Sequence, residues 1–387
     1  MPNYMAPDIY VEEISTGPRP IGAVGTSTAA FLGRAPNPKA FPNDPRAINN
    51  WSEFLREFTV EGSTSTDLSH AVFGFFQNGG TRCFVVNIGD SKTLGAGLNA
   101  IESLDEVAIV AAPGFCDAAS FQDVLTLCER LGDRVAIFDP PKDVTKIDLL
   151  TQVATPPKEG GKASGAARPP MSDKGAAAFY YPRIKVRDPL SPDGRLVEVP
   201  PSGHMAGIWA RTDASRGVHK APANEMIRGA LDVAYRVTRA EQEVLNPAGV
   251  NCIRFFPTEG IRVWGARTIA AEASEWRYLN VRRLFNMIEE SIAKGTRWVV
   301  FEPNDRPLWR DIKRDVSAFL RTQWRDGALM GRTPEEAFFV QCDDETNPRE
   351  SIDQGRVVIM VGIAPVKPAE FIIFRIGQHS GGVEIEA

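Results

Sequence analysis

The chain has 387 residues, of which 43% are hydrophobic and 24% are charged, and its formal net charge is −5 at pH 7. This length is sufficient for two or three domains with sizeable cores, so we expect a folded globular protein. An acidic balance without a block of basic residues argues against general binding to nucleic acid or to an anionic membrane surface.

Neither a secretion signal nor a membrane span is expected. The N-terminus, "MPNYMAPDIYVEE", lacks a basic start followed by an apolar run, and the stretch of about eighteen apolar residues that a membrane helix requires is absent. The cysteines are widely spaced, form no CxxC pair and have apolar neighbours. This pattern predicts buried, reduced thiols rather than disulfides or metal ligands for Cys83, Cys116, Cys128, Cys252 and Cys342.

The first half of the chain alternates strand and helix patterns. A short extended segment from Ile9 to Ile14 precedes a linker rich in Gly, Pro and Ser, residues 15–28, and then the apolar strand "AAFLGRA". A helix and the buried strand "CFVVNI" follow within residues 67–88. The apolar strands "VAIVAAP" and "VAIFDPP" then flank a helix, which makes a βαβ unit and predicts an α/β domain with a partly parallel sheet.

Residues 152–177 contain almost no large apolar side chain and predict a mobile surface loop, and the second half of the chain begins later, with the helix near residue 224. We expect a strand at "FYYPRIKV", a helix near residues 224–245, and two amphipathic helices at residues 281–295 and 307–327 with the buried strand "RWVVFEP" between them. Three further strands, "AFFVQCD", "RVVIMVGIAPV" and "EFIIFRI", complete a second α/β domain.

No catalytic or metal-binding pattern is recognisable. The four histidines form no HExxH motif, the segment "GAVGTSTAAFLG" lacks the GK[ST] ending of a phosphate loop, and no GxSxG elbow occurs. Asp139 follows a parallel strand, where α/β folds bind ligands, but without a recognisable partner a structural turn residue is the favoured interpretation. We therefore predict no catalytic residue, no cofactor and no metal.

Four arginines share one face of the helix that starts near Pro307. At about 100° per residue they lie within about 60° of one another, and Asp311 and Asp315 fall to the side, so the stripe is not expected to be neutralised along its own line. This pattern fits either an ordinary solvated helix face or a track for an acidic partner. The stripe consists of Arg310, Arg314, Arg321 and Arg325.

The segment "EFIIFRI" near the C-terminus has large apolar side chains on both faces of an extended strand. An edge of this kind invites pairing with another chain when it is left uncovered. The segment is therefore either a central strand of its own domain or a strand that pairs with another molecule.

Long blocks of the sequence resemble the contractile tail sheath proteins of phages and of phage-tail-like injection particles. The resemblance runs in order through nearly the whole chain, except for residues 152–177. The chain lacks room for the large outer domains of some long phage sheaths, which favours a compact injection system. The blocks are "SHAVFGFFQNGGTRCFVVNI", "VPPSGHMAGIWARTDASRGVHKAPANE", "EQEVLNPAGVNCIRFFPTEGIRVWGARTI" and "RVVIMVGIAPVKPAEFIIFRIGQ".

The resemblance implies two α/β domains with mixed sheets and two extended arms that add strands to neighbouring subunits. It divides the chain into an N-terminal arm and linker (1–20), an outer domain (21–222), an inner domain (223–366) and a C-terminal arm (367–387). The arm strands would comprise Ile9, Tyr10, Val11 and Glu12 at one end and Phe371, Ile372, Ile373, Phe374, Arg375 and Ile376 at the other.

The resemblance also implies a structural, non-enzymatic function. The protein would form a helical homo-oligomer around an inner tube and shorten to drive that tube through a target envelope, with the four arginines holding an acidic tube. Its other partners would be baseplate and tail terminator or cap proteins, without nucleic acid or membrane. The particle would be assembled in the bacterial cytoplasm and released by lysis. The alternatives are an α/β nucleotide-binding enzyme and a static self-assembling shell.

Overall fold

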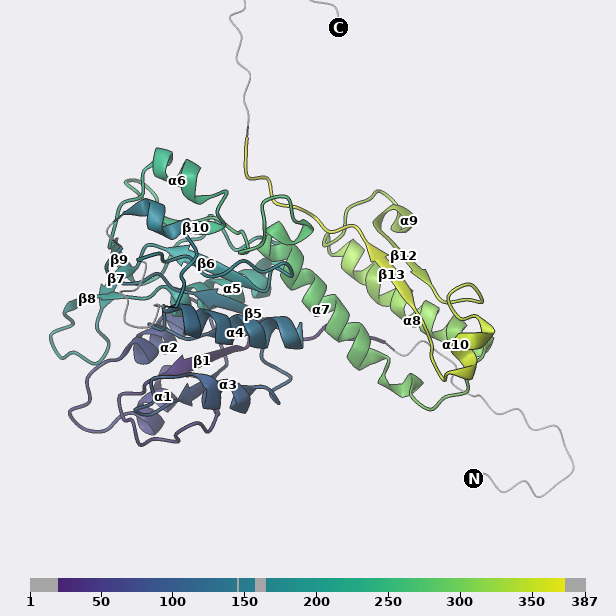
Figure 1. Ribbon diagram of the computed structural model, residues 1–387, viewed down its shortest axis with the longest axis horizontal. Helices are drawn as coiled ribbons and strands as arrows, with labels where there is room; N and C mark the ends of the chain where they lie inside the picture. The colour runs from purple at the N-terminus through teal and green to yellow at the C-terminus, as the bar shows by residue number, and fades with distance from the viewer. Residues whose placement is uncertain (1–19, 145, 157–164, 373–387) are drawn as a thin grey trace, which may run out of the picture.

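The computed structural model describes residues 20–144, 146–156 and 165–372 (Figure 1). A large α/β unit and a smaller C-terminal unit lie on either side of the long helix α7 (Leu279–Gly295). In the described part of the chain, no helix combines the length and the apolar character that crossing a bilayer demands.

The large unit is built on an eight-stranded sheet with the order β11-β10-β6-β5-β4-β1-β3-β2. Its six inner strands run parallel, and β2 and β11 pair antiparallel at the two edges. The predicted partly parallel sheet is thereby confirmed. The strands are β1 (Ala29–Gly33), β2 (Arg46–Ile48), β3 (Cys83–Asn87), β4 (Ile109–Ala111), β5 (Val135–Phe138), β6 (Ala177–Tyr181), β10 (Val250–Phe256) and β11 (Gly260–Trp264).

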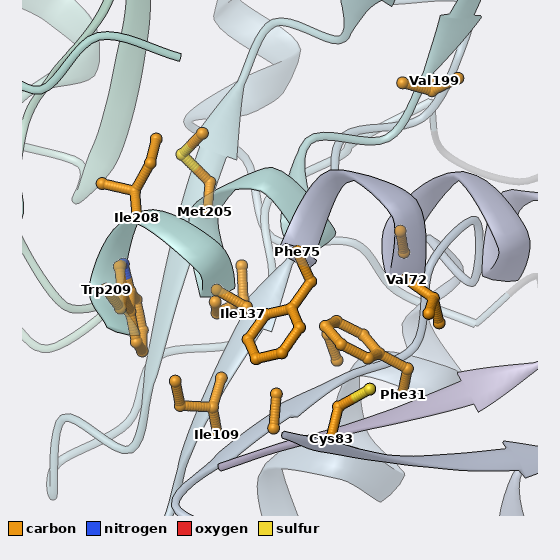
Figure 2. Close-up of a cluster of buried hydrophobic side chains, with 14 of the residues drawn as sticks. Phe31, Val72, Phe75, Cys83, Ile109, Ile137, Val199, Met205, Ile208 and Trp209 are labelled. Atoms are coloured by element: carbon orange, nitrogen blue, oxygen red, sulfur yellow. The ribbon is translucent and has the colours of Figure 1, made fainter. Parts of the chain in front are cut away.

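Helices cover both faces of this sheet, because its continuous apolar strands present buried side chains on each face. Helices α1 (Trp51–Phe58), α2 (Asp67–Gln77) and α5 (Ser202–Arg216) pack on one face. Helices α3 (Gly95–Ile101), α4 (Ala118–Leu131) and α6 (Arg239–Leu245) pack on the other. Figure 2 shows the first core, where Phe75 of α2 and Trp209 of α5 point toward the strand residues Phe31, Ile109 and Ile137.

Glycines let α2 and α5 approach closely. A Cβ atom at Gly203 would lie 2.5 Å from the carbonyl carbon of Ala71, and one at Gly207 would lie 2.5 Å from the carbonyl oxygen of Phe75. Both glycines lie one turn apart on the same face of α5. Only residues without a side chain fit against the backbone of α2 at these two positions.

The small unit contains α8 (Arg306–Arg325), α9 (Pro334–Ala337), α10 (Arg349–Asp353) and the two-stranded sheet of β12 (Phe338–Gln341) and β13 (Met360–Ile363). Asp305 caps α8 by accepting a hydrogen bond from the backbone N–H of Leu308. The apolar face of α8 packs against α7 and the sheet, and each buried side chain contributes about 1.5–3 kcal/mol relative to exposure. That face consists of Leu308, Trp309, Ile312, Val316, Phe319 and Leu320.

The domain boundary predicted at residues 222/223 does not agree with the way the strands pair. Strand β9 (Ala230–Val233) pairs with β7 (Ile184–Arg187) in a three-stranded sheet completed by β8 (Leu196–Val199). Strand β10 pairs with β6 in the large sheet. Residues up to Trp264 therefore belong to the large unit, and the division falls near the start of α7.

Three local predictions were wrong. The expected helix at 224–245 is β9 followed by α6, and the expected strand at 297–303 is the 3-10 turn η3 (Arg297–Val299) followed by exposed residues. The strand "FYYPRIKV" is two strands, β6 and β7, separated by a cis peptide bond before Pro182. Helix α5 was not predicted.

The loop expected at residues 152–177 is largely ordered where the structure describes it. Val153 forms a β-bridge with Arg168, whose Nε donates to the carbonyl oxygen of Ala248 at 2.8 Å. Ala167 and Ser172 are buried, and β6 begins at Ala177. The prediction of a wholly exposed loop was therefore wrong for residues 165–177, because small side chains fill the space beside the sheet without large apolar groups.

Candidate assembly interface

Helix α8 presents its arginine stripe on the face opposite its apolar core. Arg310, Arg321 and Arg325 are exposed, and no carboxylate among the described residues forms an ion pair with any of them. These three guanidinium groups are available to an external acidic surface.

Arg314 differs from the other three members of the stripe. Its Nη1 lies 2.9 Å from Asp311 Oδ1, and its Nε lies 3.0 Å from Oδ1 of the buried Asp315. The hydrogen bond to Asp315 is the main reason that the pKa of Arg314 is raised. The expectation that the aspartates leave the stripe unneutralised was therefore wrong at this position.

The sheet of β12 and β13 has outer edges that no further strand covers among the described residues. Phe339 and Met360 expose about half of their side chains, whereas Val340 is buried against α8. The ring of Phe339 occupies the space over Gly362. A two-stranded sheet with free edges and an exposed apolar face is suited to accepting strands from other chains.

The C-terminal segment leaves the folded body at Glu370. Phe371 and Ile372, the first two residues of the predicted arm strand, are 74% and 75% exposed and belong to none of the sheets. These two residues are therefore not part of a central strand of their own domain. The remaining members of that strand, Ile373, Phe374, Arg375 and Ile376, lie outside the described residues.

The N-terminal segment is packed along α7 from Ile21 onward. The backbone N–H of Val24 donates to Ser291 Oγ at 3.0 Å, and Ile21 is buried in the core of the small unit. Thr26 Oγ1 donates to Asp213 at 2.6 Å, and its carbonyl oxygen accepts from Arg283 at 3.0 Å. This part of the predicted linker is thus held in place. The residues of the predicted N-terminal arm strand, Ile9, Tyr10, Val11 and Glu12, lie outside the described residues.

The side chains that could carry out chemistry, Asp139 and the cysteines, lie in environments that explain them structurally. Asp139 is buried at the end of β5, where its carboxylate accepts hydrogen bonds from the backbone N–H (2.8 Å) and the hydroxyl (2.6 Å) of Ser202. All five cysteines are free, and burial raises the pKa of Cys128 and of Cys252 to about 12, so these thiols stay protonated at neutral pH. Within residues 20–144, 146–156 and 165–372, no group of three His, Cys, Asp or Glu side chains is placed to hold a metal ion.

Two protein-family models match adjacent parts of this chain. A model described as the phage tail sheath C-terminal domain matches residues 271–378, and one described as the phage tail sheath protein central domain matches residues 165–269. A solved sheath of the extracellular contractile injection system PVC, in the contracted state, is 31% identical over 98% of this chain and 99% of its own, with a TM-score of 0.80.

The chain belongs to the contractile tail sheath family. The sheath of the anti-feeding prophage in its contracted state is similarly close, at 30% identity over 97% of this chain and 100% of its own, with a TM-score of 0.77.

Curated relatives match over smaller shares of their length. A putative prophage major tail sheath protein of Pseudomonas aeruginosa is 27% identical over 69% of this chain, and the tail sheath protein of Vibrio phage KVP40 is 30% identical over 45% of it. The chain spans 64% of the first of these sheath proteins and 26% of the second. The boundary between the two family models, at residues 269/271, agrees with the observed division near the start of α7.

Proposed function

We propose that this protein is the sheath subunit of a contractile injection machine, polymerising as a helical sleeve around an inner tube and contracting to drive the tube through a target envelope. The observation that supports this most strongly is the match to the PVC sheath over 98% of this chain and 99% of that chain. A match of this extent includes both units. We assign the chain no enzymatic role and no cofactor.

The terminal segments link the subunits into a mesh. Each arm adds a strand to the β12–β13 sheet of a neighbour, whose outer edges are free of other strands in the described structure. Strand addition satisfies backbone hydrogen bonds and buries the exposed apolar side chains of both partners, among them Phe339 and Phe371. The arms keep the lattice connected while the folded bodies rotate and slide.

The exposed arginines of α8 contact an acidic inner tube. Arg310, Arg321 and Arg325 supply three positive charges on one face of the small unit, none of which is paired with a carboxylate of the described residues. Arg314, although part of the same stripe, contributes less because two aspartates hold it. Charge complementarity of this kind fixes register and partner choice more than it adds affinity.

Contraction proceeds without nucleotide hydrolysis. The extended sleeve is a kinetically trapped state, and the contracted sleeve buries more surface between bodies. Baseplate proteins at one end of the sleeve trigger its contraction, and a terminator or cap protein closes the other end. Assembly takes place in the bacterial cytoplasm, and lysis releases the particle.

Electron microscopy of the purified protein, expressed with and without its tube partner, tests this proposal. We expect striated, tube-filled sleeves of one length that shorten after a trigger. Sleeves that never shorten would instead support a static shell, and monomers that bind nucleotide tightly would support the α/β enzyme.

A further inference from the structure

The point at which the C-terminal segment leaves the body is held by an ion pair between Arg267 and Glu370. Arg267 Nε lies 2.9 Å from Glu370 Oε1, and Nη2 lies 2.7 Å from Oε2, so the pair is bidentate. The two side chains are only 5% and 16% exposed. A bidentate, largely buried pair is directional and is less screened by salt than a surface pair.

Arg267 is itself fixed to the large sheet. Asn251 on β10 is fully buried, and its side chain accepts from the backbone N–H of Arg267 and donates to the carbonyl oxygen of Arg267, both at 2.7 Å. Arg267 Nη1 also donates to the carbonyl oxygen of Asn246 at 3.1 Å. The guanidinium group therefore has little freedom to follow Glu370 if the segment is pulled.

A second contact lies four residues earlier along the segment. Asn280, near the start of α7, donates from Nδ2 to the carbonyl oxygens of Val366 (3.1 Å) and His219 (2.7 Å). Residues 366–370 thus cross from the small unit to the edge of the large unit, and the next residue, Phe371, is 74% exposed. The side chain of Glu370 is thus the last in this segment with a described ion pair to the large unit, and the two residues after it, Phe371 and Ile372, are both largely exposed.

We propose that Arg267 and Glu370, the C-terminal anchor, position the C-terminal arm and transfer its tension to the large sheet. This inference rests on the proposed sheath function. If Glu370 is replaced, its contacts with Arg267 and with the Tyr278 hydroxyl (3.4 Å) are both lost, the contacts of the described segment that remain are those with the small unit and Asn280, and the segment peels away from the large unit. With the anchor, the arm starts from a fixed point and direction, which determines the neighbour that it can reach.

The test compares the full-length chain with Glu370→Ala and Glu370→Gln variants, each expressed with the tube partner. The matched control is Glu243→Gln, which removes a carboxylate from the exposed pair of Arg239 and Glu243 on α6. We expect both position-370 variants to remain folded by far-ultraviolet circular dichroism. We expect faster backbone hydrogen exchange at residues 366–372 in their monomers, with unchanged exchange in β12 and β13.

Sleeves counted by electron microscopy should be about tenfold fewer, or broken into short pieces, for both position-370 variants and unchanged for Glu243→Gln. Arg267→Lys retains the charge but cannot form the bidentate pair, so an intermediate loss is expected. Normal numbers of intact sleeves from Glu370→Ala would overturn the anchor, as would sleeve loss without faster exchange at 366–372. Failure of the unaltered chain to form any sleeve would instead contradict the proposed function.

Discussion

Arg283 on α7 and Asp213 on α5 form a bidentate ion pair that is almost completely buried, with 3% and 6% of their side chains exposed. The same carboxylate accepts the hydroxyl hydrogen of Thr26, and the guanidinium group lies 4.7 Å from the centre of the Trp209 ring. This cluster joins the N-terminal segment and the large unit to the helix that carries the small unit.

Replacing Asp213 by Asn should lower the free energy of unfolding by about 3–5 kcal/mol, because an uncompensated guanidinium group would remain buried. Urea unfolding of the monomer measures the change. The double variant Asp213→Leu with Arg283→Met should lose much less, since it removes both charges together. If the double variant is as unstable as the single one, the charge argument fails and packing around Thr26 is responsible.

Replacing Gly203 by Ala should destabilise the monomer by about 1–3 kcal/mol, toward the upper end because the added methyl group meets the backbone of Ala71. Gly95→Ala is the matched control. Gly95 also lies in a helix, but a Cβ atom there would meet nothing within 4 Å. That change should be neutral or slightly stabilising. Equal effects of the two substitutions on the urea midpoint would mean that α2 and α5 separate without cost.

His204 should make the large unit sensitive to acid. The side chain is buried beside α2 and neither ring nitrogen has a hydrogen-bond partner in the described structure, and burial lowers its pKa from 6.5 to about 3. The unfolded state binds a proton at this histidine more readily than the folded state does. His204 therefore does not lower the free energy of unfolding above pH 6.5, and it lowers that free energy by at most about 1.4 kcal/mol per pH unit as the pH falls from 6.5 toward 3.

Asp139 acts in the opposite direction, so the test of His204 must be a difference between variants. Burial raises the pKa of Asp139 from 3.8 to about 7, and its contribution to stability decreases as the pH rises between these values. The difference in unfolding free energy between the natural chain and His204→Leu cancels this contribution. Between pH 6.5 and pH 4, the natural chain should lose more unfolding free energy than His204→Leu. A difference that stays constant over this range would exclude His204 as the acid-sensitive group.

Changing Arg321 and Arg325 to Glu should leave the fold intact, because both side chains are exposed on the face opposite the apolar core of α8. The expected result is sleeves that are empty or already contracted, since an acidic tube would be repelled. Arg239→Glu, on an exposed side chain of α6, provides the control for a charge reversal elsewhere. Extended, tube-filled sleeves from the double variant would show that the stripe does not contact the tube.

The sequence allowed the α/β class to be predicted because apolar strands and amphipathic helices such as α4 and α8 have a clear period. Helix α5 was missed because it is buried on most sides, from Ser202 to Ala210, and so shows no apolar stripe. The apolar run at 297–303 misled in the opposite sense, since Val300 and Phe301 are 64% and 102% exposed. A short apolar run does not distinguish a buried strand from an exposed turn.

The contacts at the roots of the two terminal segments could not be predicted from the sequence. Arg267 and Glu370 are separated by 103 positions, and Thr26 and Arg283 by 257, so no local pattern signals either contact. The arginine stripe was predictable as a helical face, but the pairing of Arg314 depends on side-chain conformation. Helical angles place Asp311 and Asp315 beside the stripe without showing that one guanidinium group reaches both.

The central claim, that terminal strands link these subunits into a sleeve, is tested most directly by electron microscopy of a chain truncated after Ile372. This chain retains the anchor pair of Arg267 and Glu370 and every contact of residues 364–370, so its monomer should have the circular dichroism spectrum and the urea midpoint of the full-length protein. With the tube partner present, we predict sleeves from the full-length chain and only folded monomers from the truncated one. Sleeves of normal length from the truncated chain would contradict the account.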